Sequence, residues 1–166
     1  MSPIKSFPLN VLALCTGNSA RSILCESLIN HHGGKNWVAY SAGSHPRGAV
    51  HPMALQTLRS HHHDIAGLRS KSWNEFADAN APKLDIVITV CDNAAAEVCP
   101  VWHGAPLKIH WGIVDPAAAS VNEQAAAFER TYVTLERRIK RMVELPIADL
   151  ERELLQTELR RLSLVA

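Results

Sequence analysis

The residues best suited to chemistry lie near the start of the 166-residue chain, in the run Cys-Thr-Gly-Asn-Ser-Ala-Arg-Ser. Five small residues separate Cys15 from Arg21 in this run. A backbone that carries such small side chains can curl so that successive N–H groups point at one tetrahedral anion. The guanidinium of Arg21 can close the ring with two parallel donors. The same donors stabilise a thiolate, which makes Cys15 the candidate nucleophile.

We name residues 15–22 the cradle and predict that all of them bind an oxyanion: Cys15, Thr16, Gly17, Asn18, Ser19, Ala20, Arg21 and Ser22. Gly17 permits close approach of the backbone, and Asn18 tolerates a left-handed conformation. The hydroxyls of Ser19 and Ser22 can donate to the sulfur or to the loop. A cysteine and an arginine at this spacing also occur by chance, so the argument depends on the elements around them.

The cradle lies between a predicted strand and a predicted helix. Residues 10–14 form an aliphatic run, and from about Ser19 apolar residues recur at helical spacing. Further strands are predicted at 37–41, 84–90 and 107–110, and helical segments at 52–61, 72–78 and 125–142. This alternation predicts the α/β class: a single-domain, open, mainly parallel four-stranded sheet with helices on both faces. Ligand sites of such sheets lie beyond the carboxyl ends of the strands, where Cys15 and Cys91 both fall.

We divide the chain into a catalytic domain over residues 1–145 and a C-terminal helical extension of the same domain over residues 146–166. The extension mixes leucines with charged residues in an amphipathic pattern, and we expect it to dock on the domain. A formal net charge of +1 gives no general attraction for nucleic acid. No run approaches the roughly 20 apolar residues of a membrane span, and the N-terminus lacks a cleavable signal. We therefore expect a cytoplasmic protein with no nucleic-acid or membrane partner.

The four cysteines are Cys15, Cys25, Cys91 and Cys99. In a cytoplasmic chain we expect no structural disulfide among them, because the cytosol keeps thiols reduced. Cys25 lies among apolar residues of the first helix and is interpreted as a buried residue. The run His61–His63 is interpreted as a solvent-exposed loop, because no cysteine or histidine pair lies nearby at zinc spacing. We expect no bound cofactor.

The cradle resembles the phosphate loop of the low-molecular-weight protein tyrosine phosphatase fold, including its asparagine and the serine after the arginine. Within that superfamily, the stretches 11–24, 40–46, 88–95 and 110–117 are similar to the arsenate reductases that use this fold. The resemblance covers roughly residues 10–145. It implies that the chain reduces arsenate to arsenite.

The same resemblance implies roles for three further residues. Asp115, followed by Pro116, would be the general acid that protonates the oxygen leaving as sulfur attacks, although Asp-Pro turns are common in any protein. Cys15 would add to arsenate with loss of water, Cys91 would attack Cys15 to expel arsenite, and Cys99 would then take over the disulfide. Seven residues separate Cys91 from Cys99, one more than expected for the thioredoxin-coupled branch. Thioredoxin and glutathione with glutaredoxin both stay open as the external thiol reductant.

Two alternatives and one further site remain open. A phosphatase acting on phosphotyrosine or a small phosphoester would use the same cradle and Asp115, and a module that binds an oxyanion without turnover would need the cradle alone. Phosphatases of this fold carry an aromatic pair after the proline, whereas residues 117–119 are alanines here, which favours a small inorganic substrate. Some relatives bind potassium through an asparagine, a glutamate and a serine, which Asn18, Glu26 and Ser41 could match.

Overall fold

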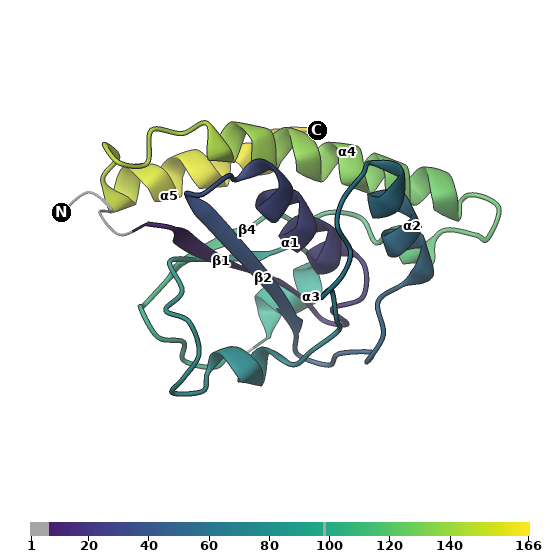
Figure 1. Cartoon of the computed structure of the whole chain (residues 1–166), viewed down its shortest axis with the longest axis horizontal. Coiled ribbons are helices and arrows are strands. Elements are labelled where there is room, and N and C mark those ends of the chain that lie inside the picture. Colours follow the sequence, from purple (N-terminus) through teal and green to yellow (C-terminus); the bar gives the residue numbers. More distant parts are fainter. Residues whose placement is uncertain (1–6, 98) are drawn as a thin grey trace.

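The computed structural model describes residues 7–97 and 99–166 and is built on one parallel sheet. The strands are β1 Leu9–Cys15, β2 Trp37–Gly43, β3 Ile86–Thr89 and β4 Leu107–His110, in the order β2-β1-β3-β4. Leu14 of β1 lies opposite Ala42 of β2 and Thr89 of β3, so the three strands end together. The predicted α/β class with a four-stranded parallel sheet is confirmed (Figure 1).

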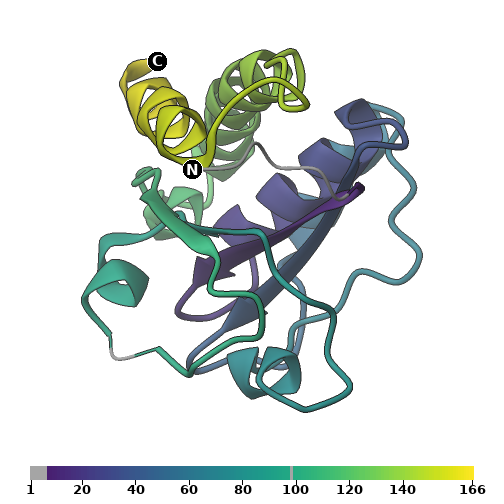
Figure 2. The ribbon, with the colours of Figure 1, turned by 90° about the vertical axis from the view of Figure 1, so that its left-hand side faces the viewer.

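Helices connect and cover the strands. They are α1 Arg21–His32, α2 Pro52–Ser60, α3 Asp92–Ala96, α4 Gln124–Val143 and α5 Arg152–Arg161, with 3-10 turns η1 Trp73–Phe76, η2 Pro116–Ala118 and η3 Leu162–Leu164. The helices α1, α4 and α5 lie on one side of the sheet, and the shorter α3 and η1 lie on the other (Figure 2). Both faces are thus covered, as a parallel sheet requires.

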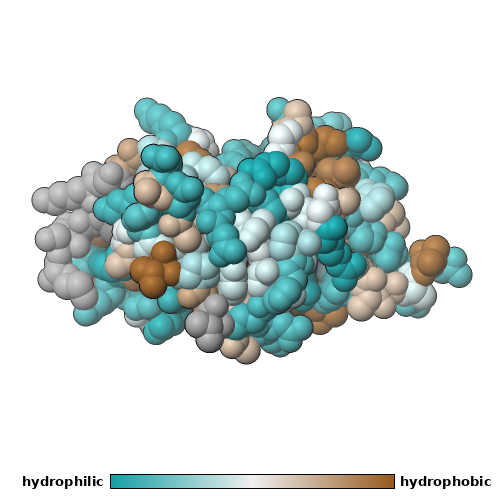
Figure 3. Space-filling model, turned by 90° about the horizontal axis from the view of Figure 1, so that it is seen from below, coloured by the Kyte–Doolittle hydropathy of each residue, from teal (hydrophilic) through white to brown (hydrophobic). Residues whose placement is uncertain are grey.

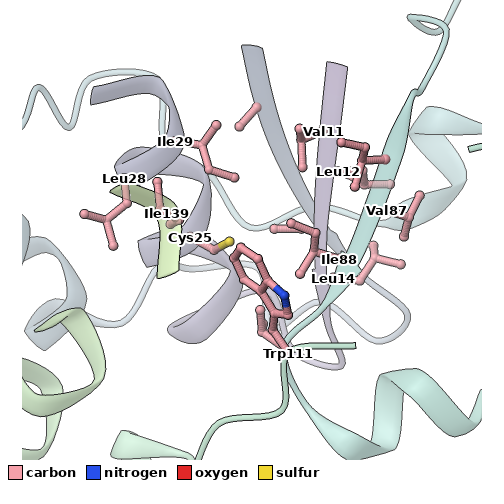
Figure 4. Close-up of a cluster of buried hydrophobic side chains, with 14 of the residues drawn as sticks. Val11, Leu12, Leu14, Cys25, Leu28, Ile29, Val87, Ile88, Trp111 and Ile139 are labelled. Atoms are coloured by element: carbon pink, nitrogen blue, oxygen red, sulfur yellow. The ribbon is translucent and has the colours of Figure 1, made fainter. Parts of the chain in front are cut away.

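The core lies between the sheet and the long helices. Leu14, Ile88, Cys25, Ile139 and Trp111 are fully buried and gather in one cluster (Figure 4). A strand buried on both faces needs a continuous apolar run rather than an alternating one, which explains the aliphatic sequence of β1.

The C-terminal extension is attached to this core. Leu155 and Leu159 of α5 are fully buried. The indole Nε1–H of Trp111 donates to the carbonyl oxygen of Leu159 at 2.8 Å, which joins α5 to the end of β4. The predicted docking of a terminal amphipathic helix is confirmed, whereas the division at residue 145 remains a prediction.

Two local expectations need correction. The strand predicted at 84–90 is shorter, because only Ile86–Thr89 pairs with neighbours on both sides. The histidine run is not simply a solvent-exposed loop, because His63 is buried, with Nδ1 2.8 Å from the hydroxyl of Ser27 and Nε2 2.7 Å from that of Tyr132. Burial lowers the pKa of His63 to about 4, so the imidazole is neutral and structural.

The surface carries scattered apolar groups. The face seen in Figure 3 is mostly hydrophilic, with separate apolar patches. Val101, Val114, Val121 and Leu164 are each more than four-fifths exposed, at different places in the chain. Within residues 7–97 and 99–166, no helix has the length and apolar character needed to cross a membrane.

Candidate active site

The cradle forms where β1 ends at Cys15 and α1 begins at Arg21. The carbonyl oxygens of Thr16, Gly17 and Ser19 accept hydrogen bonds from the backbone N–H groups of His45, Arg47 and His51, at 2.9, 3.0 and 2.9 Å. In a trans peptide the C=O and the following N–H point in opposite directions. The N–H groups that follow these carbonyls therefore point away from the 45–51 loop, which leaves them available to an anion.

Asn18 fixes the shape of the cradle and orients a donor toward the thiol. It adopts a left-handed φ of 43°, as its residue type predicts, and its Nδ2 donates to the hydroxyl of Ser22 at 2.8 Å. Because that hydroxyl oxygen already accepts a bond, its own hydrogen is free to point at Cys15 Sγ, which lies 2.9 Å away. Cys15 is 4 % exposed. The hydrogen bond from Asn18 to Ser22 thus allows the Ser22 hydroxyl to direct an O–H donor at the buried sulfur.

Arg21 connects the cradle to the loop that carries Asp115. One guanidinium nitrogen donates to the carbonyl oxygen of Ile113 at 3.0 Å, and the other lies 3.8 Å from Asp115 Oδ2. Asp115 Oδ1 accepts from the N–H of Ala117 at 3.0 Å, which holds the carboxyl group at the start of η2. A cavity of about 40 Å³ is lined by Cys15, Gly17, Ser19, Ala20, Arg21, Arg47, Asp115 and Ala117. The structure therefore brings the predicted nucleophile, arginine and acid together around one small space.

Cys91 lies beside the cradle because β3 is paired with β1. Its Sγ is 3.7 Å from the hydroxyl oxygen of Thr16, and the side chain is buried. The N–H of Ala94 donates to Cys91 Sγ at 3.4 Å, so the thiol caps the first turn of α3. A second thiol is thus held against the residue that follows Cys15.

Cys99 is held less firmly. It is partly buried, and its Sγ lies 3.7 Å from the carbonyl oxygen of Glu97. In the described part of the chain, no disulfide or hydrogen bond joins Cys99 to Cys91 or Cys15. Burial raises the pKa of the Cys99 thiol, and Lys108 partly opposes that shift. Of the seven residues between Cys91 and Cys99, Val98 lies outside the described residues.

Two residues near these thiols were not singled out from the sequence. The hydroxyl of Thr16 donates to Glu97 Oε1 at 3.1 Å, and His45 Nδ1 lies 3.7 Å from Glu97 Oε2. Glu97 therefore links the segment that carries Cys99 to the cradle. Only their positions in the sequence could have indicated these two residues. His45 lies within the stretch 40–46 that resembles arsenate reductases, and Glu97 lies between two candidate redox cysteines.

Of the residues suggested for potassium, Glu26 and Ser41 meet directly, and Lys71 connects Asn18 to them. The hydroxyl of Ser41 donates to Glu26 Oε1 at 2.6 Å, and Lys71 Nζ lies 3.6 Å from the same oxygen. The backbone N–H of Lys71 donates to Asn18 Oδ1 at 2.9 Å. Burial raises the pKa of Glu26 and lowers the pKa of Lys71, so each charge depends on its partner. An ammonium group thus already faces the carboxylate, and the potassium site remains a prediction.

Cys25 plays no part in this arrangement. It is completely buried on α1, and burial raises its pKa to about 12. The interpretation as a buried residue is confirmed.

Comparison with known proteins identifies the family of this chain. The family model for low molecular weight phosphotyrosine protein phosphatases matches residues 10–156. The chain belongs to this family. The model covers both the cradle and the Asp115 loop.

Known proteins similar to this chain are named for arsenate. An arsenate reductase of Bacillus licheniformis is 38 % identical over 133 residues, which span 79 % of this chain and 92 % of the relative. The crystal structure of arsenate reductase from Archaeoglobus fulgidus aligns with a TM-score of 0.64 at 27 % identity, covering 81 % of this chain and 99 % of that one. A thioredoxin-dependent arsenate reductase of Corynebacterium glutamicum shares the fold, with a TM-score of 0.56 and 23 % identity over 82 % of this chain and 64 % of its own. The resemblance to arsenate reductases of this fold is confirmed.

Proposed function

We propose that the chain reduces arsenate to arsenite, with Cys15 as the nucleophile and Cys91 as the thiol that resolves its adduct. The observation that carries this proposal is the position of Cys91 Sγ, 3.7 Å from the hydroxyl of Thr16, the residue that follows Cys15. Hydrolysis of a phosphoester needs one thiol, whereas reduction of arsenic(V) to arsenic(III) needs two electrons. A pair of neighbouring thiols can supply them by forming a disulfide.

The first step forms a bond between sulfur and arsenic. The Cys15 thiolate attacks arsenic while the cradle N–H groups and Arg21 bind the oxygens. One oxygen leaves as water, and Asp115 provides a proton for it. The proximity of Asp115 to Arg21, at 3.8 Å, supports this assignment because it places the acid at the cavity wall.

The second step transfers the electrons. The Cys91 thiolate attacks Cys15 Sγ, and a disulfide forms as the sulfur–arsenic bond breaks. The electron pair of that bond stays on arsenic, which leaves as arsenite. Cys99 then attacks Cys91 and frees Cys15, and an external thiol reductant reduces the bond between Cys91 and Cys99.

We propose a thioredoxin-type protein as that reductant, with glutathione and glutaredoxin as the alternative. The C. glutamicum protein of this fold is described as thioredoxin-dependent. Partial exposure of Cys99 supports a role at the surface, where a partner thiol can reach it. The repeated thiol steps also favour the cytoplasm, because they require cysteines that are kept reduced.

A phosphatase is the second candidate, favoured by the family and by Asp115 at the cavity. The residues after Pro116 argue against an aryl phosphate as the substrate. Ala117 lines the cavity and two further alanines follow it, so this segment offers no aromatic side chain that could pack against a phenol ring.

The test compares three assays on the purified chain. Two follow arsenate-dependent oxidation of NADPH, one coupled through thioredoxin and the other through glutathione and glutaredoxin. The third follows hydrolysis of an aryl phosphate. We expect turnover in one arsenate assay and little hydrolysis. Rapid hydrolysis without arsenate-dependent oxidation in either system would reject the reductase. Sustained turnover of Cys99→Ser at the unmodified rate with glutathione would remove Cys99 from the mechanism.

A further inference from the structure

Arg47, on the loop between β2 and α2, is a cationic residue of the cavity wall that has no assigned role. Its side chain lines the same cavity as Cys15, Arg21 and Asp115. It also lies against one residue of the cradle: a β-carbon placed on Gly17 would lie 3.2 Å from Arg47 Nε and 3.3 Å from its Cγ. The absence of a side chain at Gly17 therefore gives the guanidinium of Arg47 room to lie against the cradle backbone.

The backbone around Arg47 is fixed to the cradle. The N–H of Arg47 donates to the carbonyl oxygen of Gly17 at 3.0 Å, and the N–H of Gly48 donates to the hydroxyl of Ser70 at 3.1 Å. Ser70 in turn donates to Gly17 O at 3.3 Å. The side chain itself is exposed, and no ion pair of Arg47 occurs among the residues that the structure describes. Its position is thus set by the backbone while its charge remains available.

The charges in the cavity indicate what the Arg47 guanidinium can bind. A tetrahedral oxyanion such as arsenate or phosphate carries between one and two negative charges near neutral pH, and it must approach the Cys15 thiolate. Arg21 is the other cation on the cavity wall, and part of its charge is directed at Asp115 and the carbonyl of Ile113. Arg21 alone therefore leaves the bound state with excess negative charge.

We propose that Arg47 is a second anion-binding arginine, which contacts the outward-facing oxygens of a tetrahedral oxyanion held in the cradle. It raises affinity for a doubly charged anion without taking part in the bond changes at sulfur. A guanidinium at the entrance of the cavity forms charge-assisted hydrogen bonds to oxygens that the cradle N–H groups do not reach. This inference deepens the proposed function and rests on it for the identity of the substrate.

Inorganic phosphate is the probe that separates the two proposals, because it binds as an oxyanion but cannot be reduced. Isothermal titration of the reduced full-length chain with phosphate would give Kd for the unmodified protein, Arg47→Ala, Arg47→Lys and Arg59→Ala. Arg59 is an exposed arginine on α2, so Arg59→Ala makes the same change in net charge away from the cavity. Circular dichroism of each variant checks that it is folded.

We expect Arg47→Ala to raise Kd for phosphate about tenfold, as for the loss of a charge-assisted hydrogen bond. Arg47→Lys should fall between Arg47→Ala and the unmodified chain, and Arg59→Ala should change Kd less than twofold. In the arsenate assay, KM should rise by a similar factor while kcat changes little.

Equal phosphate affinity in Arg47→Ala and the unmodified chain would overturn the inference, as would an equal loss in Arg59→Ala or a lack of saturable phosphate binding by the unmodified chain. If Arg47→Ala alone weakens phosphate binding but the chain reduces no arsenate, the anion site stands and the proposed reaction fails.

Discussion

The cradle and the segment from Cys91 to Cys99 carry the candidate thiols in opposite ways. In the cradle, backbone carbonyls are bound by a neighbouring loop, and Asn18 is bound both to Ser22 and to Lys71. The second segment begins with a five-residue helix, and Cys99 beyond it contacts a backbone carbonyl at 3.7 Å. One region is fixed before any ligand arrives, and the other is held by few interactions.

This difference suits the roles proposed for the two regions. An anion is bound strongly only by donors that are already oriented, so the cradle gains from rigidity. A thiol that passes a disulfide onward has to travel, and a helix of five residues has little stability of its own. The Glu97 contacts with Thr16 and His45 are therefore suited to hold the segment near the cradle without locking it there.

The largest expected effect separates binding from chemistry within the cradle. Cys15→Ser should lower arsenate-dependent consumption of reductant by at least about 10³-fold, because a hydroxyl is a much weaker nucleophile than a thiolate. Phosphate affinity, measured by titration, should change only a few-fold, because the backbone donors remain. Residual turnover above about one per cent would contradict the role of Cys15.

The buried ion pair of Lys71 and Glu26, next to the cradle, can be broken by the substitution Lys71→Ala. The side chains of Lys71 and Glu26 are 7 % and 12 % exposed, so Lys71→Ala leaves a carboxylate buried without its partner. We expect the free energy of unfolding in urea to fall by about 3 kcal/mol. Lys35→Ala, at an exposed position, is the control and should change it by less than about 0.5 kcal/mol. Equal loss in both variants would contradict the role of the buried pair.

Dependence on potassium tests whether the Lys71 ammonium takes the place of a bound cation beside Glu26. Exchange of sodium for potassium at constant ionic strength should leave the phosphate affinity of the unmodified chain unchanged, because the Lys71 ammonium already faces Glu26. In Lys71→Ala, potassium should restore part of any affinity that is lost. Strong potassium dependence of the unmodified chain would instead support a cation site at Asn18, Glu26 and Ser41.

The smallest expected effect concerns Cys99, the thiol held by few contacts. Burial raises the pKa of Cys99, and the thiolate is the reactive form, so labelling by iodoacetamide should keep accelerating as the pH rises past 9. Because Glu97 contributes to that upward shift, Glu97→Gln should speed labelling at pH 8 about twofold. Peptide mass spectrometry follows Cys99 and, as an internal control, the buried Cys25, which should stay unlabelled. A labelling rate that is constant above pH 8 would contradict the raised pKa.

The parts of the molecule that the sequence predicts well are encoded locally. A strand, a run of small residues and a helix occur consecutively, so the cradle and its place at the sheet edge follow from residues 10–29 alone. The alternation of strands and helices predicts a parallel sheet, but it does not predict that β3 pairs with β1 and so brings Cys91 near the cradle. The family resemblance added Asp115, which no local pattern distinguishes from an ordinary turn.

The contacts that were missed join distant segments. Lys71 reaches Asn18 and Glu26 from a loop without periodicity, and Arg47 enters the cavity from another. His63 is buried because Ser27 and Tyr132, 36 and 69 residues away, contact its two ring nitrogens. Residue types alone cannot indicate such pairs, because the polar groups become partners only after the chain has folded.

The three hydrogen bonds from the 45–51 loop to the cradle carbonyls have a consequence for the energetics of substrate entry. Water around a free oxyanion must reorient whenever the charge on the anion changes, and that reorganisation adds to the barrier of a reaction. Peptide dipoles that are fixed by their own hydrogen bonds form a solvation shell that is oriented in advance. In the proposed reaction, charge moves from sulfur to oxygen and then to arsenic, and this shell has no reorientation to undergo.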